Sequence, residues 1–159
     1  MIDMIENPYS DVFCIVEKDD KYEAFEQIIS SCAIFSSLPE SLDKFIASVI
    51  RRERKQTTDI GHGVAIAHGK VLGLKKTVIG LGFSQRGIVF KDGGEPVHLI
   101  FVIASPLSTG SDYLQSVAAL LSWVHDMEFR RELAQGDFTD NVASFLEMLE
   151  KCHYHAMKE

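Results

Sequence analysis

Two histidines fall within ten residues, in the stretch GHGVAIAHGK that runs from 61 to 70. Imidazole is the side chain that most readily gains and loses a proton near neutral pH, and its neutral form is a nucleophile. The residues between the histidines are small or aliphatic and alternate as in a strand, which places Val64, Ile66 and His68 on one side. Glycines at both ends of the stretch leave room around His68. The pattern predicts an accessible, nucleophilic histidine at the end of a strand.

The chain as a whole has the composition of one globular domain that spans residues 1–159. It has 159 residues, of which 46% are hydrophobic, and its three cysteines form no CxxC pair. The net charge of −7 and the isoelectric point near 5.3 argue against binding to nucleic acid or to an anionic membrane. No apolar run approaches the roughly 20 residues that cross a bilayer, and the N-terminus does not resemble a signal peptide. We expect a cytoplasmic protein without membrane insertion.

Hydrophobic spacing predicts helices at both ends of the chain and strands between them. A short strand at 12–16 precedes a helix that reaches Phe35, and a second helix begins at Leu42 and ends within 51–55. Short apolar runs then predict strands at 63–67, 76–83, 87–90 and 96–104, with a hairpin turn at 91–96. Helical spacing returns from 111 onward. This order predicts an α/β fold, a three-layer sandwich in which a mixed sheet of about five strands carries helices on both faces.

The segment that surrounds His68 resembles the active-site signature of a known family. This family comprises the enzyme IIA domains of the fructose, mannitol and nitrogen-regulatory class in the bacterial phosphoenolpyruvate-dependent phosphotransferase system. Its signature is Arg-Glu, a short spacer, Thr-Gly-Ile-Gly, one residue, Gly, two or three small or aliphatic residues and Pro-His-Gly. The matching residues here are Arg52-Glu53, Thr58, Ile60-Gly61, Gly63, Ala65-Ile66 and His68-Gly69. The resemblance extends over nearly the whole chain, because the later strand and helices follow the family's order.

The resemblance implies a phosphotransferase activity centred on His68. In this reading His68 accepts a phosphoryl group from a histidine phosphocarrier protein (HPr or its nitrogen-branch equivalent). It then passes the group to a permease domain or holds it as a mark for a regulated target protein. Arg52 would bind the phosphoryl oxygens, backbone N–H groups around Gly69 would add donors, and Thr58 is either a turn residue or a phosphate contact. The transfer requires neither metal nor cofactor. Because no permease domain is fused to the chain, a nitrogen-regulatory role is expected over sugar uptake.

Three residues depart from the family's pattern. The proline before the active histidine is Ala67 here, and the glycine after the signature threonine is Asp59, which brings a carboxylate close to the expected dianion. Relatives carry a second active-site histidine where this chain has Tyr113. A tyrosine donates one hydrogen bond but supplies no positive charge at neutral pH. His62, in the loop before the strand, is a candidate to take the place of the missing imidazole.

Two other interpretations remain open at this level. The same fold with a degenerate site would act as a non-catalytic regulatory binding module. A metal-dependent hydrolase that uses His62, His68 and His98 is a third reading, but the chain has no HExxH spacing to support a metal site. For His98, burial with a backbone hydrogen bond is the simpler expectation.

Overall fold

The computed structural model describes residues 11–107 and residue 118. Within this part the chain forms, in order, β1 (Phe13–Ile15), α1 (Lys21–Ser31), the short 3₁₀ helix η1 (Ala33–Ser37), α2 (Leu42–Lys55), β2 (Asp59–Gly61), β3 (Val64–Val71), β4 (Val78–Val89) and β5 (Pro96–Pro106). The helices predicted beyond residue 110, and Tyr113 with them, lie outside the described residues.

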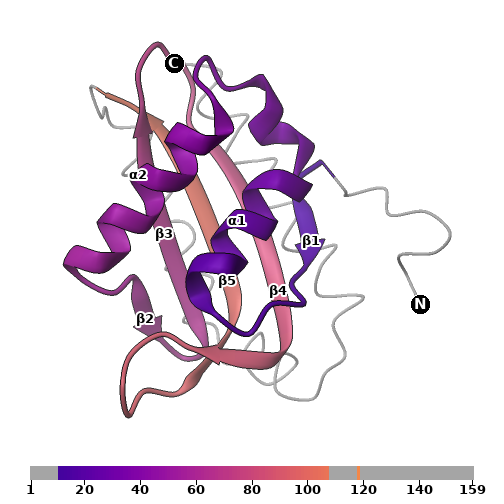
Figure 1. Ribbon diagram of the computed structural model, residues 1–159, viewed down its shortest axis with the longest axis vertical. Coiled ribbons are helices and arrows are strands. Elements are labelled where there is room, and N and C mark those ends of the chain that lie inside the picture. Colours follow the sequence, from indigo (N-terminus) through magenta and orange to yellow (C-terminus); the bar gives the residue numbers. More distant parts are fainter. Residues whose placement is uncertain (1–10, 108–117, 119–159) are drawn as a thin grey trace, which may run out of the picture.

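The strands form one mixed sheet of five, in the order β1-β4-β5-β3-β2 (Figure 1). β3 runs parallel to β5 and β1 parallel to β4, whereas the β4–β5 and β2–β3 pairs are antiparallel. The runs predicted as separate strands at 76–83 and 87–90 are one strand, β4, whose register shifts between Phe83 and Ile88. The short strand β2 was not predicted, because three residues are too few to show a period. The predicted mixed five-stranded sheet is confirmed.

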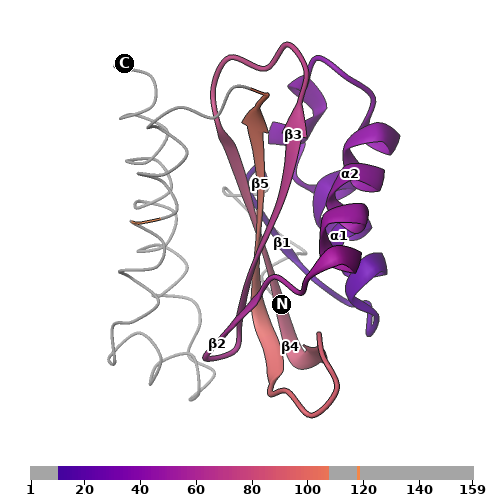
Figure 2. The same ribbon diagram turned by 90° about the vertical axis from the view of Figure 1, so that its left-hand side faces the viewer.

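Helices α1 and α2 pack side by side on one face of this sheet (Figure 2). Their buried side chains form a core with every second residue of β5, namely Ile100, Val102 and Ala104. The alternate residues of β5 point to the other face, and Leu99, Phe101 and Ile103 are fully buried there. A strand that is apolar and buried on both faces is typical of the centre of an α/β fold. No helix among the described residues has the length and apolar character needed to cross a membrane.

Polar side chains define where the two helices begin. The Asp20 carboxylate accepts hydrogen bonds from the backbone N–H groups of Tyr22 and Glu23, and the Ser41 hydroxyl accepts from the N–H of Lys44. The first helix ends at Ser31 rather than continuing to Phe35, because residues 33–37 tighten into the 3₁₀ turn.

Helix α2 crosses β3 at Gly69, and only glycine permits this approach. A Cβ atom at Gly69 would lie 2.8 Å from Cε1 of Phe45 and 3.1 Å from Cγ2 of Val49, both on α2. The missing side chain therefore lets the helix pack directly on the strand backbone. As a result, the last turns of α2 end beside the part of β3 that carries His68.

Candidate active site

His68 lies on the face of the sheet opposite to α1 and α2. Val64, Ile66 and His68 share this face, as their alternation predicts, while Ala65 and Ala67 are buried in the core beneath the helices. The His68 ring is half-buried, and its Nε2 atom lies 2.6 Å from Oγ of Ser105, with which it forms a hydrogen bond. Ser105, near the end of β5, is fully buried. The imidazole is therefore held by a fixed hydroxyl on one side and reaches solvent on another.

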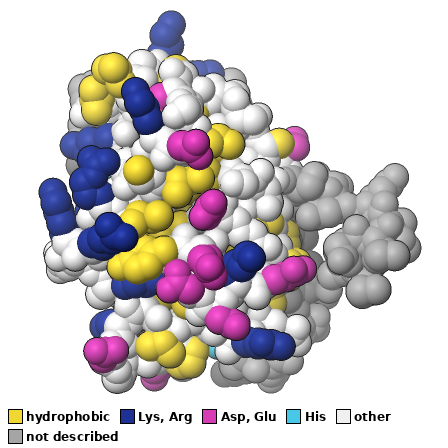
Figure 3. All heavy atoms as spheres, viewed as in Figure 1, with side chains coloured by type: hydrophobic (Ala, Val, Ile, Leu, Met, Phe, Trp, Pro, Cys, Tyr) yellow, Lys and Arg dark blue, Asp and Glu magenta, His cyan; other side chains and the backbone are white. Residues whose placement is uncertain are grey.

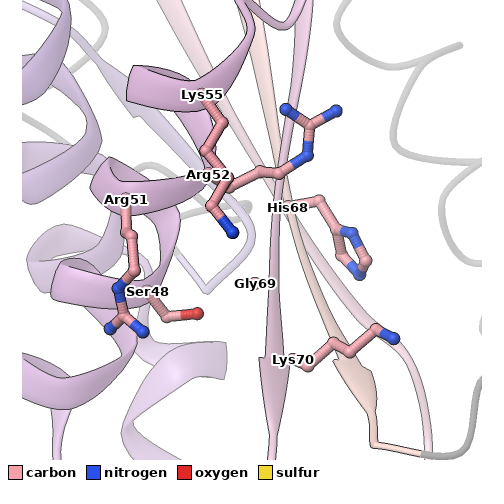
Figure 4. Close-up of a pocket in the computed structure, with 7 residues that line it drawn as sticks. All are labelled: Ser48, Arg51, Arg52, Lys55, His68, Gly69 and Lys70. Atoms are coloured by element: carbon pink, nitrogen blue, oxygen red, sulfur yellow. The ribbon is translucent and has the colours of Figure 1, made fainter.

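A hollow of about 280 Å³ opens beside His68. One wall is the strand segment His68–Gly69–Lys70, and the other is a single face of α2 (Figure 4). The α2 residues that line it, Ser48, Arg51, Arg52 and Lys55, are spaced three, four and seven residues apart, as one face of a helix requires. The described lining residues include four cationic side chains and no carboxylate. Such a pocket favours an anion.

Arg52 extends from α2 past the edge of β3 to the side on which His68 lies (Figure 4). Its Nη1 atom donates a hydrogen bond of 2.9 Å to the backbone carbonyl of Gln56, which caps the helix. This bond fixes the side chain and leaves further guanidinium N–H groups, of which an arginine has five. The predicted pairing of Arg52 with His68 in one pocket is thus present in the geometry, and its role toward phosphate stays a prediction.

The pKa of His68 is lowered to about 4. Burial of the ring is the main cause, and the positive charges of Lys70 and then Arg52 add to it. Each of these effects disfavours the imidazolium form. The ring is therefore neutral at physiological pH, and one of its two nitrogens carries an available lone pair.

A buried ion pair between Glu53 and Lys21 holds the C-terminal end of α2 against α1. Glu53, next to Arg52 in sequence, is only 2% exposed and accepts a hydrogen bond of 3.1 Å from Nζ of Lys21 on α1. The Lys21 ammonium also donates to the carbonyl of Phe90 at 2.8 Å. The Thr58 backbone N–H and hydroxyl both donate to Oε1 of Glu53. Of the two interpretations of Thr58, the structure favours the turn residue, because its hydroxyl is already bound to this carboxylate.

Gly69 lines the pocket, but its backbone amide points elsewhere. The N–H of Ile66 bonds to the carbonyl of Thr58 on the β2 side of β3. Since amide directions alternate along a strand, the N–H of Gly69 points toward β5 and those of His68 and Lys70 point toward the outer edge. The amide donors expected near Gly69 are therefore those of its two neighbours, and the visible role of Gly69 is the close packing of α2.

Other candidate residues lie away from this pocket. His62 is exposed, adopts a φ of 60° in the turn before β3, and does not line the pocket beside His68. It is not placed to substitute for a second active-site histidine. The Asp59 carboxylate binds the N–H of Gly61 at 2.8 Å and does not line the pocket, so the expected carboxylate beside the dianion is absent there. His98 is half-buried, with Nδ1 2.9 Å from the carbonyl of Ser84. Within the described residues, no group of three metal-binding side chains forms a site.

Sequence reasoning missed several residues that surround His68, three of which line the pocket and one of which, Ser105, bonds to the ring. Lys70 could have been found from strand alternation, because it lies two residues after His68 and shares its face. The α2 residues Arg51 and Lys55 could have been found from helical spacing with Arg52. Ser105 carried no such signal, because its contact depends on the parallel pairing of β3 with β5, in which it lies opposite Lys70.

Comparison with known proteins gives this pocket a family context. The family described as "Phosphoenolpyruvate-dependent sugar phosphotransferase system, EIIA 2" matches residues 9–150. The chain belongs to this EIIA family. The match covers most of the chain, including every described strand and helix and the complete His68 pocket.

Curated relatives of this EIIA chain fall into both the regulatory and the sugar-specific branches. A nitrogen regulatory protein of Bradyrhizobium diazoefficiens is 34% identical over 86 residues, which are 54% of this chain and 56% of that protein. The fructose-specific EIIABC component of Bacillus subtilis is 27% identical over 105 residues, 65% of this chain but only 16% of that protein. A fructose-like EIIA component of Escherichia coli is 26% identical over 132 residues, 82% and 88% of the two chains. The chain thus spans less than two thirds of the first two relatives.

Solved structures confirm the EIIA fold. The nitrogen regulatory protein IIA-Ntr of Neisseria meningitidis superposes with a TM-score of 0.68 at 24% identity, covering 79% of this chain and 86% of that one. The mannitol IIA protein of Escherichia coli also gives 0.68, at 20% identity, covering 91% and 99%. At these identities the likeness establishes the α/β fold alone.

Proposed function

We propose that this EIIA chain accepts a phosphoryl group on His68 from a histidine phosphocarrier protein and carries it for a regulatory or sugar-transport system. The observation that supports this most directly is a neutral, partly exposed imidazole at the rim of a pocket lined by cations. The family supplies the reaction class, and the pocket supplies a nucleophile and a counter-charge in one place.

The lowered pKa of His68 suits the acceptor role. An imidazole that titrated near 6.5 would be partly protonated at neutral pH, and a protonated ring has no lone pair to offer. With a pKa near 4 the ring is almost entirely neutral. The cations that lower this pKa also attract the dianion that forms when the ring is phosphorylated. The same cations therefore keep the imidazole neutral before the transfer and stabilise the phosphorylated ring after it.

The transfer exchanges one nitrogen–phosphorus bond for another. A lone pair of His68 forms the new N–P bond while the donor's P–N bond breaks, and the released electron pair stays on the donor nitrogen. Such a reaction requires mainly alignment and charge stabilisation, and in this proposal Arg52 provides both by holding the phosphoryl oxygens in parallel hydrogen bonds. The resemblance favours Nε2 as the reacting atom. In that case the Ser105 hydroxyl, now bonded to Nε2, has to turn aside and can donate to a phosphoryl oxygen instead.

A labelling experiment tests the proposal. The chain is incubated with phosphoenolpyruvate, the general phosphotransferase enzyme and a histidine phosphocarrier protein, and bound phosphate is measured. We expect an acid-labile, base-stable phosphate that disappears in His68→Ala and persists in His62→Ala, an exposed histidine outside the pocket. Arg52→Gln should slow labelling without removing the acceptor.

Failure of labelling would favour the second candidate, a non-catalytic regulatory binding module. Tyr113 in place of the second histidine is the observation that supports this alternative. The decisive result is a carrier protein that becomes phosphorylated in the mixture while the chain stays unlabelled. Label that remains in His68→Ala would also overturn the assignment.

The next acceptor distinguishes the two branches of the proposal. One solved relative is a complex of mannitol enzyme IIA with phosphorylated enzyme IIB from Escherichia coli. Loss of label from phosphorylated His68 to an added IIB domain would support a role in sugar transport. Retention of the label, with phosphorylation-dependent binding of a target protein, would support the nitrogen-regulatory role. The cytoplasmic location and the single-domain organisation stay predictions.

A further inference from the structure

Lys70 lies beside His68 on the same face of β3. Residues two apart on a strand point to the same side, and Figure 4 shows both side chains extending from the strand in the same direction. Lys70 is exposed and lines the pocket. The two ion pairs formed within the described part of the chain, Lys21–Glu53 and Arg86–Asp19, do not involve it. Its charge lies on the side of β3 that carries the His68 ring (Figure 4) and is not neutralised by any described carboxylate.

The ammonium of Lys70 is close enough to act on the ring. Of the two positive charges that lower the pKa of His68, that of Lys70 has the larger effect and that of Arg52 the smaller. In Figure 4 the His68 ring lies between the Arg52 guanidinium and the Lys70 ammonium. The two cations come from different elements, Arg52 from α2 and Lys70 from β3. They therefore approach the ring from two directions.

A phosphoryl group on the ring brings about two negative charges. Arg52 balances one of them, whereas Arg51 and Lys55 remain on the α2 side of β3 (Figure 4). Where the family resemblance implies a second histidine, this chain has Tyr113, which supplies no positive charge at neutral pH. We propose that Lys70 supplies the second positive charge of the phosphoryl site. This inference rests on the proposed function and adds to it a second phosphoryl-binding residue.

The chemical role of Lys70 requires no proton transfer. Its ammonium donates hydrogen bonds to phosphoryl oxygens while the N–P bond of His68 forms and the donor's bond breaks, and it remains protonated throughout. A lysine is suited to this role because its long stem lets a compact charge follow the phosphoryl group from donor to acceptor. Hydrogen bonds between charged groups are about twice as strong as neutral ones.

The test uses a donor that needs no partner protein. Phosphoramidate transfers its phosphoryl group to a histidine nitrogen and releases ammonia, so the labelling rate of His68 reports on the pocket alone. Lys70→Met should slow this labelling about tenfold or more, because one charged contact is lost. Lys70→Arg, which keeps the charge, should stay within a fewfold of wild type. Lys76→Met, an exposed lysine outside the pocket, should have no effect.

A second readout separates charge from folding. NMR titration should show the pKa of His68 rising in Lys70→Met and staying near the wild-type value in Lys70→Arg and Lys76→Met. Equal labelling rates for wild type and Lys70→Met would overturn the role of Lys70, whatever the titration shows.

Failure of this inference differs from failure of the proposed function. If phosphoramidate labels His68 but the phosphocarrier protein does not, the proposed function fails and the Lys70 comparison still decides the inference. If both donors label His68 and Lys70→Met is unaffected, the inference fails and the function stands. If neither donor labels His68, the site does not hold a phosphoryl group and both are wrong.

Discussion

Acidification should weaken the fold through His68 more than through an ordinary histidine. In the unfolded chain a histidine titrates near 6.5, whereas the folded structure lowers the pKa of His68 to about 4. Between these values the unfolded chain binds a proton at this residue and the folded chain does not. Protons therefore stabilise the unfolded state. The free energy of unfolding should fall as the pH is lowered from about 6.5 to about 4, and this contribution should level off below that range.

The size of this effect follows from the gap between the two pKa values. At about 1.4 kcal/mol for each pH unit, the gap corresponds to about 3 kcal/mol once the pH is below both values. Because His68 is only half-buried, screening by water reduces the expected contribution to about 2 kcal/mol. Somewhat more than half of it should be lost by about pH 5, and the remainder as the pH falls through about 4, where the folded chain also binds the proton.

Chemical denaturation of wild type and His68→Gln over a series of pH values measures the effect. Glutamine does not titrate and can still hydrogen-bond the Ser105 hydroxyl, so it serves as the reference. Carboxylates also contribute to acid unfolding, but they are common to both proteins and cancel in the difference. The wild type should lose about 1–2 kcal/mol more than His68→Gln between about pH 7 and about pH 5.

Parallel curves for the two proteins would refute this reasoning. They would mean that His68 titrates alike in the folded and unfolded chain, so that the pocket neither desolvates the ring nor acts on it with its cations. If the wild type instead gained stability on acidification relative to His68→Gln, the folded structure would raise the pKa of His68 rather than lower it. Such a result would indicate a negative charge beside the ring.

Three further variants test other parts of the site. Gly69→Ala should cost about 1–3 kcal/mol in denaturation experiments, because the added Cβ overlaps Phe45 and Val49 on α2. Glu53→Gln should cost about 2 kcal/mol, because it leaves the ammonium of Lys21 partly buried without its carboxylate, whereas the exposed Glu23→Gln should be nearly neutral. Ser105→Ala should raise the pKa of His68 in an NMR titration, because a hydroxyl that donates to Nε2 stabilises the neutral ring.

Each of these variants has a result that contradicts its premise. A Gly69→Ala protein as stable as wild type would mean that α2 does not pack directly on β3. Equal stabilities of Glu53→Gln and Glu23→Gln would show that the buried ion pair contributes nothing. A lower pKa of His68 in Ser105→Ala would show that Nε2 carries the proton, which leaves Nδ1 as the nucleophilic nitrogen.

The sequence allowed prediction of those features that depend on local spacing. Alternation in the His68 strand correctly assigned its two faces, and helical spacing placed α2 and its basic end. The double glycine at 93–94 correctly predicted the hairpin between β4 and β5, since Gly93 adopts a φ of 77°. These features are readable because side-chain direction is fixed by backbone period alone.

Features that depend on pairing between distant segments could not be predicted. The Ser105 contact arises from the register of two parallel strands that are 37 residues apart at the contacting positions. The bonds of Thr58 depend on a helix residue, Glu53, turned inward by the packing of α1. His62 is near His68 along the chain, but it belongs to the turn that precedes β3 and does not line the pocket.

Arg52 and Glu53 are adjacent along the chain and opposite in charge, yet one faces the pocket and the other the protein interior. Successive side chains on an α-helix differ by about 100° in direction, so the rotational phase of α2 decides which charge faces His68. Deleting a single residue from α2 upstream of this pair would bring the carboxylate to the position that the Arg52 guanidinium now occupies, beside the imidazole, and would move the guanidinium to the position of Arg51. The same sequence motif would then repel the anion it now attracts, so the polarity of the site depends on the phase of one helix.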